Sequence, residues 1–293
     1  MRRILALVFT VVLALVFEAP EVLAQPAPAD LESPRGMALG TGVRAGSWGN
    51  DALAYNPANM PLLQLYHLGA FTGYGLQARR WMPGASVTDS STLSGLAAGL
   101  SFRGALTSRD SSYEGVDGRL ALAIPIAEVI GLGASVRYLS LSTDDERDPR
   151  NHGRVRGFTV DAAARLTPTK GFHIAALGQN LVDRNSPLAP RLVGGSLAFG
   201  MLKDFSFGGD VLVDLSDPKD RVNILGGGGL EYVLFEVLPL RAGYKYHSGR
   251  NVHTVTGGIG FTSQSFSSDL ALRQDVHGSS QTELLMELRY HVR

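Results

Sequence analysis

Apolar and polar residues alternate with a period of two along most of the chain. In Ile130 to Tyr138 (IGLGASVRY), one parity carries Ile, Leu, Ala, Val and Tyr, and the other carries Gly, Ser and Arg. The alternation recurs in Phe158 to Leu166, Phe205 to Leu215, Leu240 to Tyr246 and Leu284 to Val292. Strict alternation of this kind indicates two-faced β-strands. We therefore expect an all-β protein with almost no helix after the first sixty or so residues.

The pattern predicts fourteen strands, which is an even number. They are expected near residues 65–75, 77–88, 94–106, 115–125, 129–142, 154–166, 171–182, 190–200, 204–215, 222–233, 237–247, 253–263, 266–275 and 281–292. From the fourth strand on, short connections alternate with longer polar ones. Bacterial outer-membrane barrels have short periplasmic turns and longer outside loops. The phase of the alternation predicts a periplasmic N-terminus, with residues 144–154 (DDERDPRNHGR) as the largest outside loop.

The residues on the polar parity separate a β-sandwich from a membrane barrel. A sandwich usually presents Lys, Glu and Thr on its solvent face. Here the polar parity is mostly Gly, Ala and Ser, with one or two charges per strand. A barrel turns its apolar face to lipid and its polar face to the lumen. We therefore predict an antiparallel transmembrane β-barrel of about fourteen strands with small residues lining a narrow interior.

The charged residues of the polar parity are expected to face this lumen. They are Arg137, Asp161, Arg165, Asp210, Asp214, Glu231, Arg241, Lys245, Asp269, Arg273, Glu287 and Arg289. The two signs balance in this set. Balance predicts an interior cross-linked by ion pairs rather than a selectivity filter of one sign.

The first residues have the form of a secretion signal. Met1 to Arg3 is basic, Ile4 to Phe17 is apolar, and Val22-Leu23-Ala24 supplies small residues before a cleavage point. The apolar run is too short to cross a membrane as a helix, so a cleaved signal is favoured over an anchor. We expect residues 1–24 to be removed. Without a cysteine, the chain forms neither a lipoprotein nor a disulfide framework.

Composition agrees with an exported membrane barrel. Lys plus Arg and Asp plus Glu number 27 each, so no net charge directs the protein to nucleic acid. Charged residues make up 18% of the chain, which is low for a soluble domain. The expected location is the outer membrane of a Gram-negative-type bacterium, with outer-membrane lipid around the barrel.

Residues 25–62 differ from the strands that follow. The stretch Gly49 to Met60 (GNDALAYNPANM) begins with Asn-Asp, which can start a helical turn, and Asn-Pro stops that turn. Residues 35–60 are also too rich in glycine to form a core of their own. The candidate residues of this segment are Gly40, Gly42, Arg44, Gly46, Asp51, Asn56 and Pro57.

The segment resembles the N-terminal signature of the FadL-like outer-membrane proteins, and more closely that of their PorV/PorQ branch. Further segments resemble that branch in the same order, among them GASVRYL (133–139), LGQNLVD (177–183) and LEYVLFEVLPLRAGYKY (230–246). The resemblance implies a fourteen-stranded barrel (63–293) whose N-terminal segment (25–62) folds into the lumen as a plug. Asn56-Pro57 would be the elbow between the two parts, or only a helix stop.

No motif supports catalysis. The chain lacks the zinc-protease, serine-hydrolase and phosphate-loop patterns. His247 and His253 flank one outer loop, but two imidazoles without a carboxylate make a poor metal site. The other histidines are scattered and expected at the membrane interface or in solvent. We predict no catalytic residues, no metal and no cofactor.

Two functions stay open. In the first, the barrel is a docking or scaffold component for exported proteins or subunits of an envelope secretion or motility machine, as implied by the PorV-like resemblance. In the second, it is a FadL-like passive transporter, with a hydrophobic small molecule bound near the plug. The short loops and balanced luminal charges favour docking, whereas the plug glycines, as flexible positions, favour transport.

Overall fold

The computed structural model describes residues 32–107, 114–127, 129–144, 152–184, 186, 188–200, 204–216 and 222–292. The predicted signal (1–24) lies outside the described residues, as does most of the predicted loop 144–154. Among the described residues, no helix is long and apolar enough to cross a membrane.

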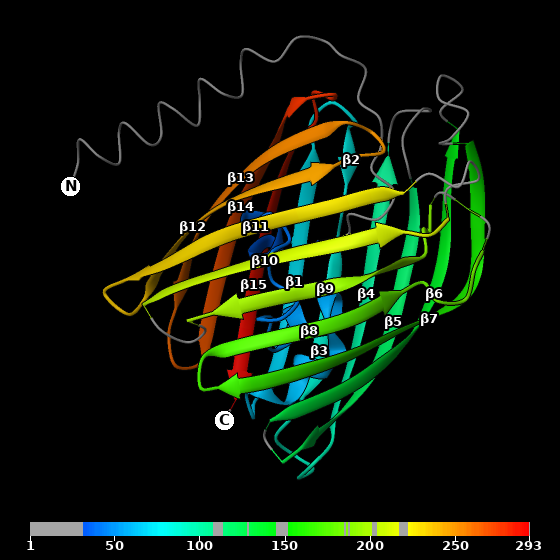
Figure 1. Cartoon of the computed structure of the whole chain (residues 1–293). Coiled ribbons are helices and arrows are strands. Elements are labelled where there is room, and N and C mark those ends of the chain that lie inside the picture. Colours follow the sequence, from blue (N-terminus) through cyan, green and yellow to red (C-terminus); the bar gives the residue numbers. More distant parts are fainter. Residues whose placement is uncertain are drawn as a thin grey trace, which may run out of the picture.

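Fifteen strands form one antiparallel sheet that closes on itself, because the first strand pairs with the last (Figure 1). They are β1 (Tyr66–Gly75), β2 (Arg80–Trp81), β3 (Gly84–Asp89), β4 (Ala97–Thr107), β5 (Glu114–Ile126), β6 (Ile130–Asp144), β7 (His152–Thr169), β8 (Phe172–Gln179), β9 (Leu192–Phe199), β10 (Phe205–Asp214), β11 (Asn223–Leu234), β12 (Leu238–His247), β13 (Val252–Thr262), β14 (Phe266–His277) and β15 (Thr282–Val292).

Strands β2 and β3 are two pieces of one wall strand. Both pair with β1 and with β4 in a single continuous register, and only Met82 and Pro83 separate them. Pro83 has no N–H to donate to a ladder, which accounts for the break. The barrel therefore has the fourteen strands that the sequence predicts, with β2 as a short extra piece, and the predicted fold class is confirmed.

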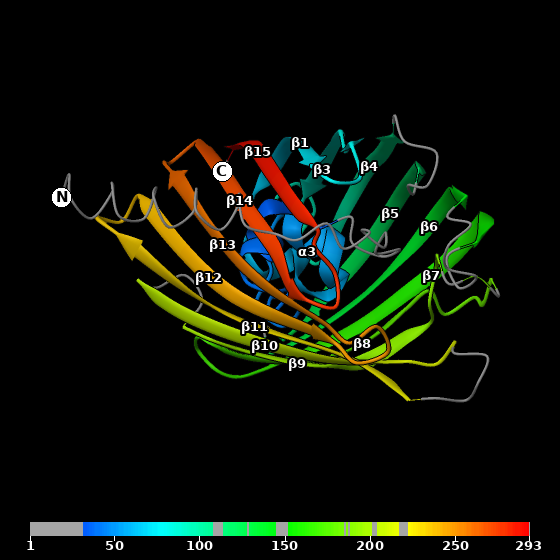
Figure 2. The same cartoon turned by 90° about the horizontal axis from the view of Figure 1, so that it is seen from above.

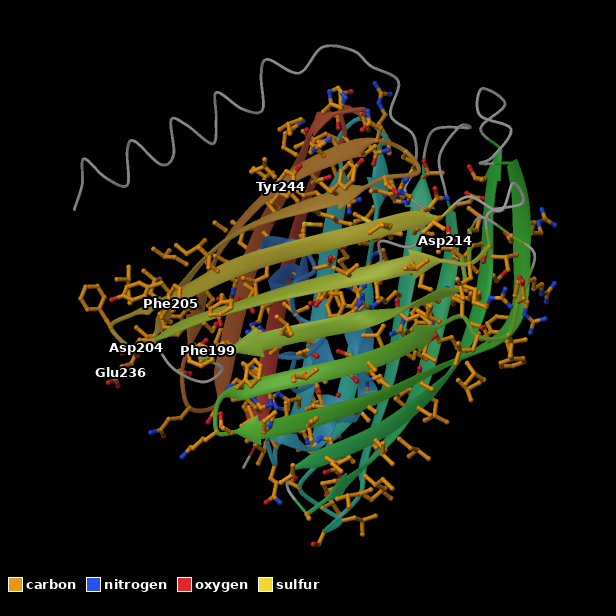
Figure 3. All side chains as sticks on the ribbon, in the orientation of Figure 1. Phe199, Asp204, Phe205, Asp214, Glu236 and Tyr244 are labelled. Carbon is orange, nitrogen blue, oxygen red and sulfur yellow. The ribbon has the colours of Figure 1, made fainter. Side chains whose placement is uncertain are left out.

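The two parities of the alternating sequence correspond to the two faces of the barrel wall. Outward side chains are large and apolar, such as Leu100 (55% exposed) and Leu120 (54%), while their neighbours Ser101 and Arg119 are buried in the lumen. A closed barrel leaves no strand edge, and its apolar outer face meets lipid. Aromatic side chains gather on the outer face near the short turns, where Figure 3 labels Phe199 and Phe205.

Residues 32–62, here called the luminal segment, lie inside the barrel (Figure 2). The segment contains α2 (Pro34–Ala38), α3 (Asn50–Tyr55) and the 3-10 helix η1 (Pro57–Leu62). Ser33 caps α2 by accepting the Gly36 N–H at 3.2 Å, and Pro34 occupies the first helical position. Asn56 ends α3, and its side chain accepts the Ala58 N–H at 3.0 Å to cap η1.

The connections fall into two groups at opposite ends of the barrel. One end, here called the short-turn end, carries residues 170–171 and 235–237. The other, the long-loop end, carries the connection 180–191 between β8 and β9. The prediction that 144–154 is the longest loop is wrong, because β6 and β7 continue as paired strands to Asp144 and His152. Long strands leave only residues 145–151 between them.

Candidate functional site

Six charged side chains of alternating sign form a closed ring in the lumen. In order around the ring they are Arg35, Glu231, Arg241, Asp269, Arg289 and Asp51. Arg35 donates two hydrogen bonds to the Glu231 carboxylate, of 3.1 and 3.2 Å, and Arg289 donates one to the Asp51 carboxylate at 3.1 Å. The ring closes where Arg35 lies 4.0 Å from Asp51. Every carboxylate therefore has a guanidinium on each side.

Two members of the ring come from the luminal segment and four from the wall. Burial disfavours the charged form of Asp51, but the guanidiniums of Arg289 and Arg35 outweigh it and hold the pKa of Asp51 below its ordinary value. The Trp48 ring lies within 5.8 Å of the Arg35 guanidinium and 5.6 Å of the Arg289 guanidinium. The ring thus ties α2 and α3 to strands β11, β12, β14 and β15.

A second contact fixes the turn between α2 and α3. Arg44 pairs with Asp210 of β10 at 2.7 Å, and its backbone N–H also donates to that carboxylate. The side-chain amides of Asn56 and Asn59 donate to the Arg44 carbonyl at 2.7 and 2.9 Å. The Ala45 N–H donates to Ser196 of β9 at 2.7 Å. Asn56 therefore holds the fold of the luminal segment besides stopping a helix.

A third cluster of charges receives the C-terminal end of α3. Asp117 and Arg119 on β5 lie beside Arg137 on β6 and Asp161 on β7, with Arg137 and Asp117 2.8 Å apart. Arg119 also donates to the carbonyls of Leu53 and Ala54. Those carbonyls are the unsatisfied acceptors at the end of a helix, where a cation is favourable.

A fourth chain of charges runs across the lumen near the start of the segment. Lys245 lies 2.8 Å from Glu32, and Arg273 lies 3.7 Å from the same carboxylate. Arg273 in turn contacts Glu283 at 3.0 Å, and Glu283 contacts Arg80 at 2.5 Å. The chain joins β12, β14, β15 and β2 through a single residue of the luminal segment, Glu32.

Where no charges intervene, the luminal segment touches the wall through glycine. A Cβ on Gly227 would lie 1.9 Å from the Gly40 carbonyl oxygen, and one on Gly208 would lie 2.1 Å from that of Gly42. Gly40 has a φ of +58°, which favours glycine, and a Cβ there would lie 2.4 Å from the Tyr244 carbonyl oxygen. We call this backbone-to-backbone contact the glycine seam. It gives Gly40 and Gly42 a packing role in the closed lumen.

The structure brings most predicted site residues to the luminal segment, but not all of them. Asp214 accepts the Ser216 N–H at 2.8 Å, away from the segment. Arg165 contacts Thr167 and lies near the segment, because a Cβ on Gly131 would lie 2.9 Å from its guanidinium and 2.3 Å from the Ala58 carbonyl oxygen. Gly46 lies beside Ala198 and Ser206, and Glu287 lies 3.9 Å from Arg289.

Several partners were missed by sequence reasoning: Glu32, Arg35, Arg80, Asp117, Arg119 and Glu283. Asp117 and Arg119 share the inward parity of β5, which is a signal that could have identified them.

The expectation that the histidines lie at the interface or in solvent is wrong for His67, His173 and His291, which are all buried. His67 is fully buried in the lumen, 5.9 Å from the Trp48 ring and 5.5 Å from His291 between ring centroids. His67 and His291 are opposite each other in the β1–β15 ladder, so their side chains lie on the same, inward face of the wall. Among the described residues, no group of three or more metal-binding side chains occurs.

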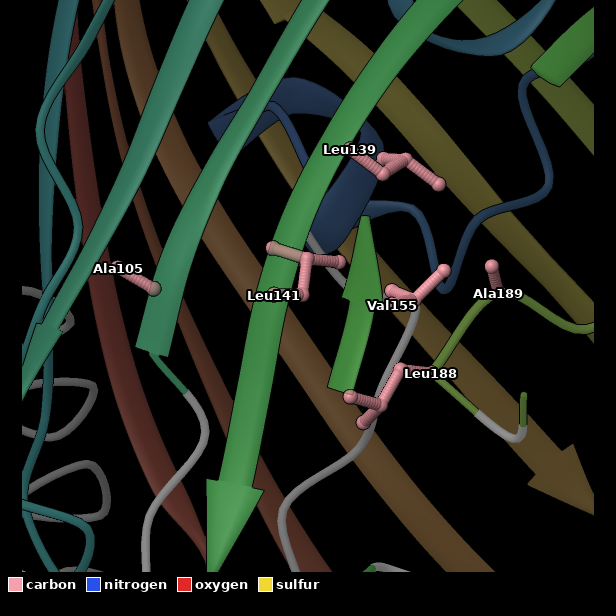
Figure 4. Close-up of a cluster of buried hydrophobic side chains, with 6 residues drawn as sticks. All are labelled: Ala105, Leu139, Leu141, Val155, Leu188 and Ala189. Atoms are coloured by element: carbon pink, nitrogen blue, oxygen red, sulfur yellow. The ribbon is translucent and has the colours of Figure 1, made fainter. Parts of the chain in front are cut away.

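The lumen on the long-loop side of the segment is partly open and mixed in polarity. A cavity of about 50 Å³ lies between Tyr55, Arg137 and Lys245 on one side and Leu192 and Leu212 on the other. It has room for a few water molecules. Closer to the long-loop end the inner wall becomes apolar, and the β8–β9 connection folds in to cover it. Figure 4 shows this cluster of Ala105, Leu139, Leu141, Val155, Leu188 and Ala189.

Comparisons with known proteins identify the fold. No family model and no curated relative match the chain. Among solved structures it is similar to the CymD monoaromatic hydrocarbon channel (TM-score 0.63, 12% identity, 89% of this chain and 97% of that one). It is also similar to the Ralstonia pickettii toluene transporter TbuX (0.61, 14%, 90% and 99%) and to a Pseudomonas aeruginosa FadL homologue (0.62, 12%, 89% and 98%).

Likeness at 12–14% identity establishes the fold alone. The chain therefore has a FadL-type outer-membrane barrel fold, which is the fold implied by the resemblance of its sequence to the FadL-like proteins. None of these three structures is described as a PorV or PorQ protein, so the finer resemblance to that branch finds no support among them.

Proposed function

We propose that the protein is a passive transporter that carries small hydrophobic molecules across the outer membrane of a Gram-negative-type bacterium. The observation that carries the proposal is the apolar inner wall at the long-loop end. Leu139, Leu141 and Val155 face the lumen there, and each is at most 3% exposed because Leu188 and Ala189 cover them. A barrel that only docks other proteins would not require an apolar luminal surface covered by a loop.

In this mechanism the apolar wall captures the ligand when the β8–β9 connection moves aside. The start of the connection is tied to β7, where the Leu181 N–H donates to the Val160 carbonyl at 2.8 Å, whereas Leu188 and Ala189 meet the wall through apolar contacts. Leu177, Leu192 and Leu212 form a second apolar cluster further along the lumen, beside the cavity. These two clusters supply successive apolar contacts of the kind that ligand sites use.

Onward passage requires the luminal segment to shift. The described wall strands pair along continuous ladders, with register shifts only in β7–β8 and β13–β14, and β3–β4–β5 pair without interruption. This favours movement past the luminal segment over exit through the wall. The short-turn end and the N-terminus would then face the periplasm, in line with the usual placing of short turns.

Two of the similar structures are a monoaromatic hydrocarbon channel and a toluene transporter, which supports the proposal. Docking of exported proteins, the first expectation from the sequence, has no comparable support. No catalytic role is proposed, since the similar structures are described as channels or transporters.

Uptake of labelled toluene by cells that express the protein tests the proposal. Wild type should raise the uptake rate above that of cells with an empty vector. Leu139→Gln should lower the gain by about tenfold, because a polar group then lines the apolar wall. Ser140→Ala, on the outward face one residue along, is the matched control and should change nothing. No gain with wild type would reject transport of this class and favour docking.

A further inference from the structure

The polarity of the β6–β7 hairpin inverts part of the way along its length. Toward the short-turn end, the outward side chains are apolar, with Val136 45% and Phe158 58% exposed. Beyond Tyr138 the inward positions become apolar, as in Leu139 and Leu141, and the outward positions become polar. A lipid-facing surface has to be apolar, so the inversion marks the level at which the barrel leaves the hydrocarbon.

An aromatic pair stands at this boundary. Tyr138 and Phe158 are opposite each other in the ladder, with ring centroids 5.2 Å apart on the outer face. Aromatic rings of this kind gather at the membrane–water interface. The Arg156 Nε donates to the Tyr138 hydroxyl at 3.2 Å, so this guanidinium is held just beyond the rings.

Two arginines continue the outward face from there. Arg156 and Arg154 are both exposed and lie two positions apart on β7, which separates their Cα atoms by about 7 Å along the strand. Across the ladder they face the hydroxyl side chains of Ser140 and Ser142. The next residue of the outward parity of β6 is Asp144, opposite His152, and on the other side of Ser142 its partner in β5 is Glu114. On the two rungs directly above the aromatic pair, the hairpin therefore presents two arginines and two serines.

We propose that this surface binds the phosphate of a lipid headgroup in the leaflet that borders the long-loop end. Its two guanidiniums match phosphate oxygens in charge and donor geometry, and the Tyr138–Phe158 pair lies where the acyl chains of the same lipid begin. The site depends on the outer face alone. It is therefore independent of what the barrel transports.

Native mass spectrometry of the detergent-solubilised barrel with added lipid tests the site. Wild type should retain phosphatidylglycerol in preference to zwitterionic phosphatidylcholine. The double variant Arg154→Gln/Arg156→Gln should lose about 25-fold in phosphatidylglycerol affinity, or roughly fivefold for each arginine. Arg79→Gln removes another exposed arginine at the same end of the barrel and should leave retention unchanged.

Two further measurements make the result decisive. The lysine variant Arg154→Lys/Arg156→Lys should keep most of the preference, because the charge is preserved. Heat-modifiable migration on a gel shows whether each variant is folded. Retention by the glutamine variant equal to that of wild type would overturn the proposal, as would an equal loss in Arg79→Gln.

Discussion

Arg289 on the last strand and Asp51 in the luminal segment form an ion pair at 3.1 Å, although 238 residues separate them in the sequence. Both side chains are buried, with exposed fractions of 2% and 0%. The pair joins the closing strand of the barrel to the segment that fills it. Loss of the pair should therefore loosen the packing of the luminal segment before it affects the pairing of the wall strands.

Asp51→Asn tests this pair. The substitution leaves Arg289 and Arg35 without one of their neutralising partners, which should destabilise the packed segment by about 3 kcal/mol. The protein has two tryptophans, so Trp81→Phe leaves Trp48 as the reporter of the segment. The urea midpoint of Trp48 fluorescence measures the change. Asp183→Asn breaks a half-exposed pair with Arg191 and should shift the midpoint little. Equal shifts in both variants would contradict the assignment.

The glycine seam predicts a difference between two adjacent glycines. Gly227→Ala places a methyl group against the Gly40 backbone and should cost about 1–3 kcal/mol or displace the segment. Gly226→Ala adds a methyl on the outward side, where the nearest atom would lie 3.9 Å away. The control should behave as wild type in the Trp48 assay. A neutral Gly227→Ala would mean that the segment packs less closely than described.

Acid should release the segment, and the direction follows from Asp51. Its pKa is lowered in the folded state, so its stabilising contribution is complete above the unfolded value of 3.8 and is lost as pH falls below it. Quenching of Trp48 by acrylamide should stay constant between pH 5 and 8 and rise at lower pH. In Asp51→Asn this acid-dependent rise should shrink. A quenching transition centred near pH 7 would point to a different group.

Removal of residues 36–49 should open the lumen. The deletion takes away Arg44 and Trp48 and the seam glycines, while leaving the strands and their outward faces intact. Planar bilayers should show low conductance for the intact protein and a stable increase for the deletion. Closed deletion channels would mean that the wall ion pairs alone block the pore. High conductance of the intact protein would contradict a filled lumen.

The orientation can be measured with single cysteines, because the chain has none of its own. Asp183→Cys lies in the β8–β9 connection, and Gln264→Cys lies in the turn between β13 and β14 at the opposite end. A membrane-impermeant maleimide should label the first in intact cells and the second only after permeabilisation. The reverse pattern would place the N-terminus outside.

Sequence alone could predict the strands because each wall residue meets either lipid or lumen, and the alternation records that choice. It could also place Asp210 and Arg289 on the inside. It could not pair them, because the partner of a luminal charge depends on strand tilt and on the path of the segment across the barrel. Arg35 illustrates this, since it lies in a glycine-rich stretch with no periodic signal and yet binds Glu231.

The β8–β9 connection shows a second limit. Leu188 and Ala189 read as ordinary loop residues, but they pack on Leu139 and Val155. That contact depends on the inversion of polarity in β6 and β7, which only becomes interpretable when the inner and outer faces are known. The same inversion explains why the predicted loop 144–154 is longer than the observed one. Where β6 and β7 extend beyond the membrane they are still paired strands, but their outward residues are polar, as loop residues are.

The glycine seam also constrains how the molecule can be assembled. Backbone meets backbone at Gly40 and Gly227, so there is no clearance for side chains of the segment, such as Leu39 and Val43, to slide past the finished wall. A closed barrel could not be threaded from one end by this segment. The strands therefore have to assemble around a luminal segment that is already in position, which makes residues 32–62 a template for the order in which the later hairpins join.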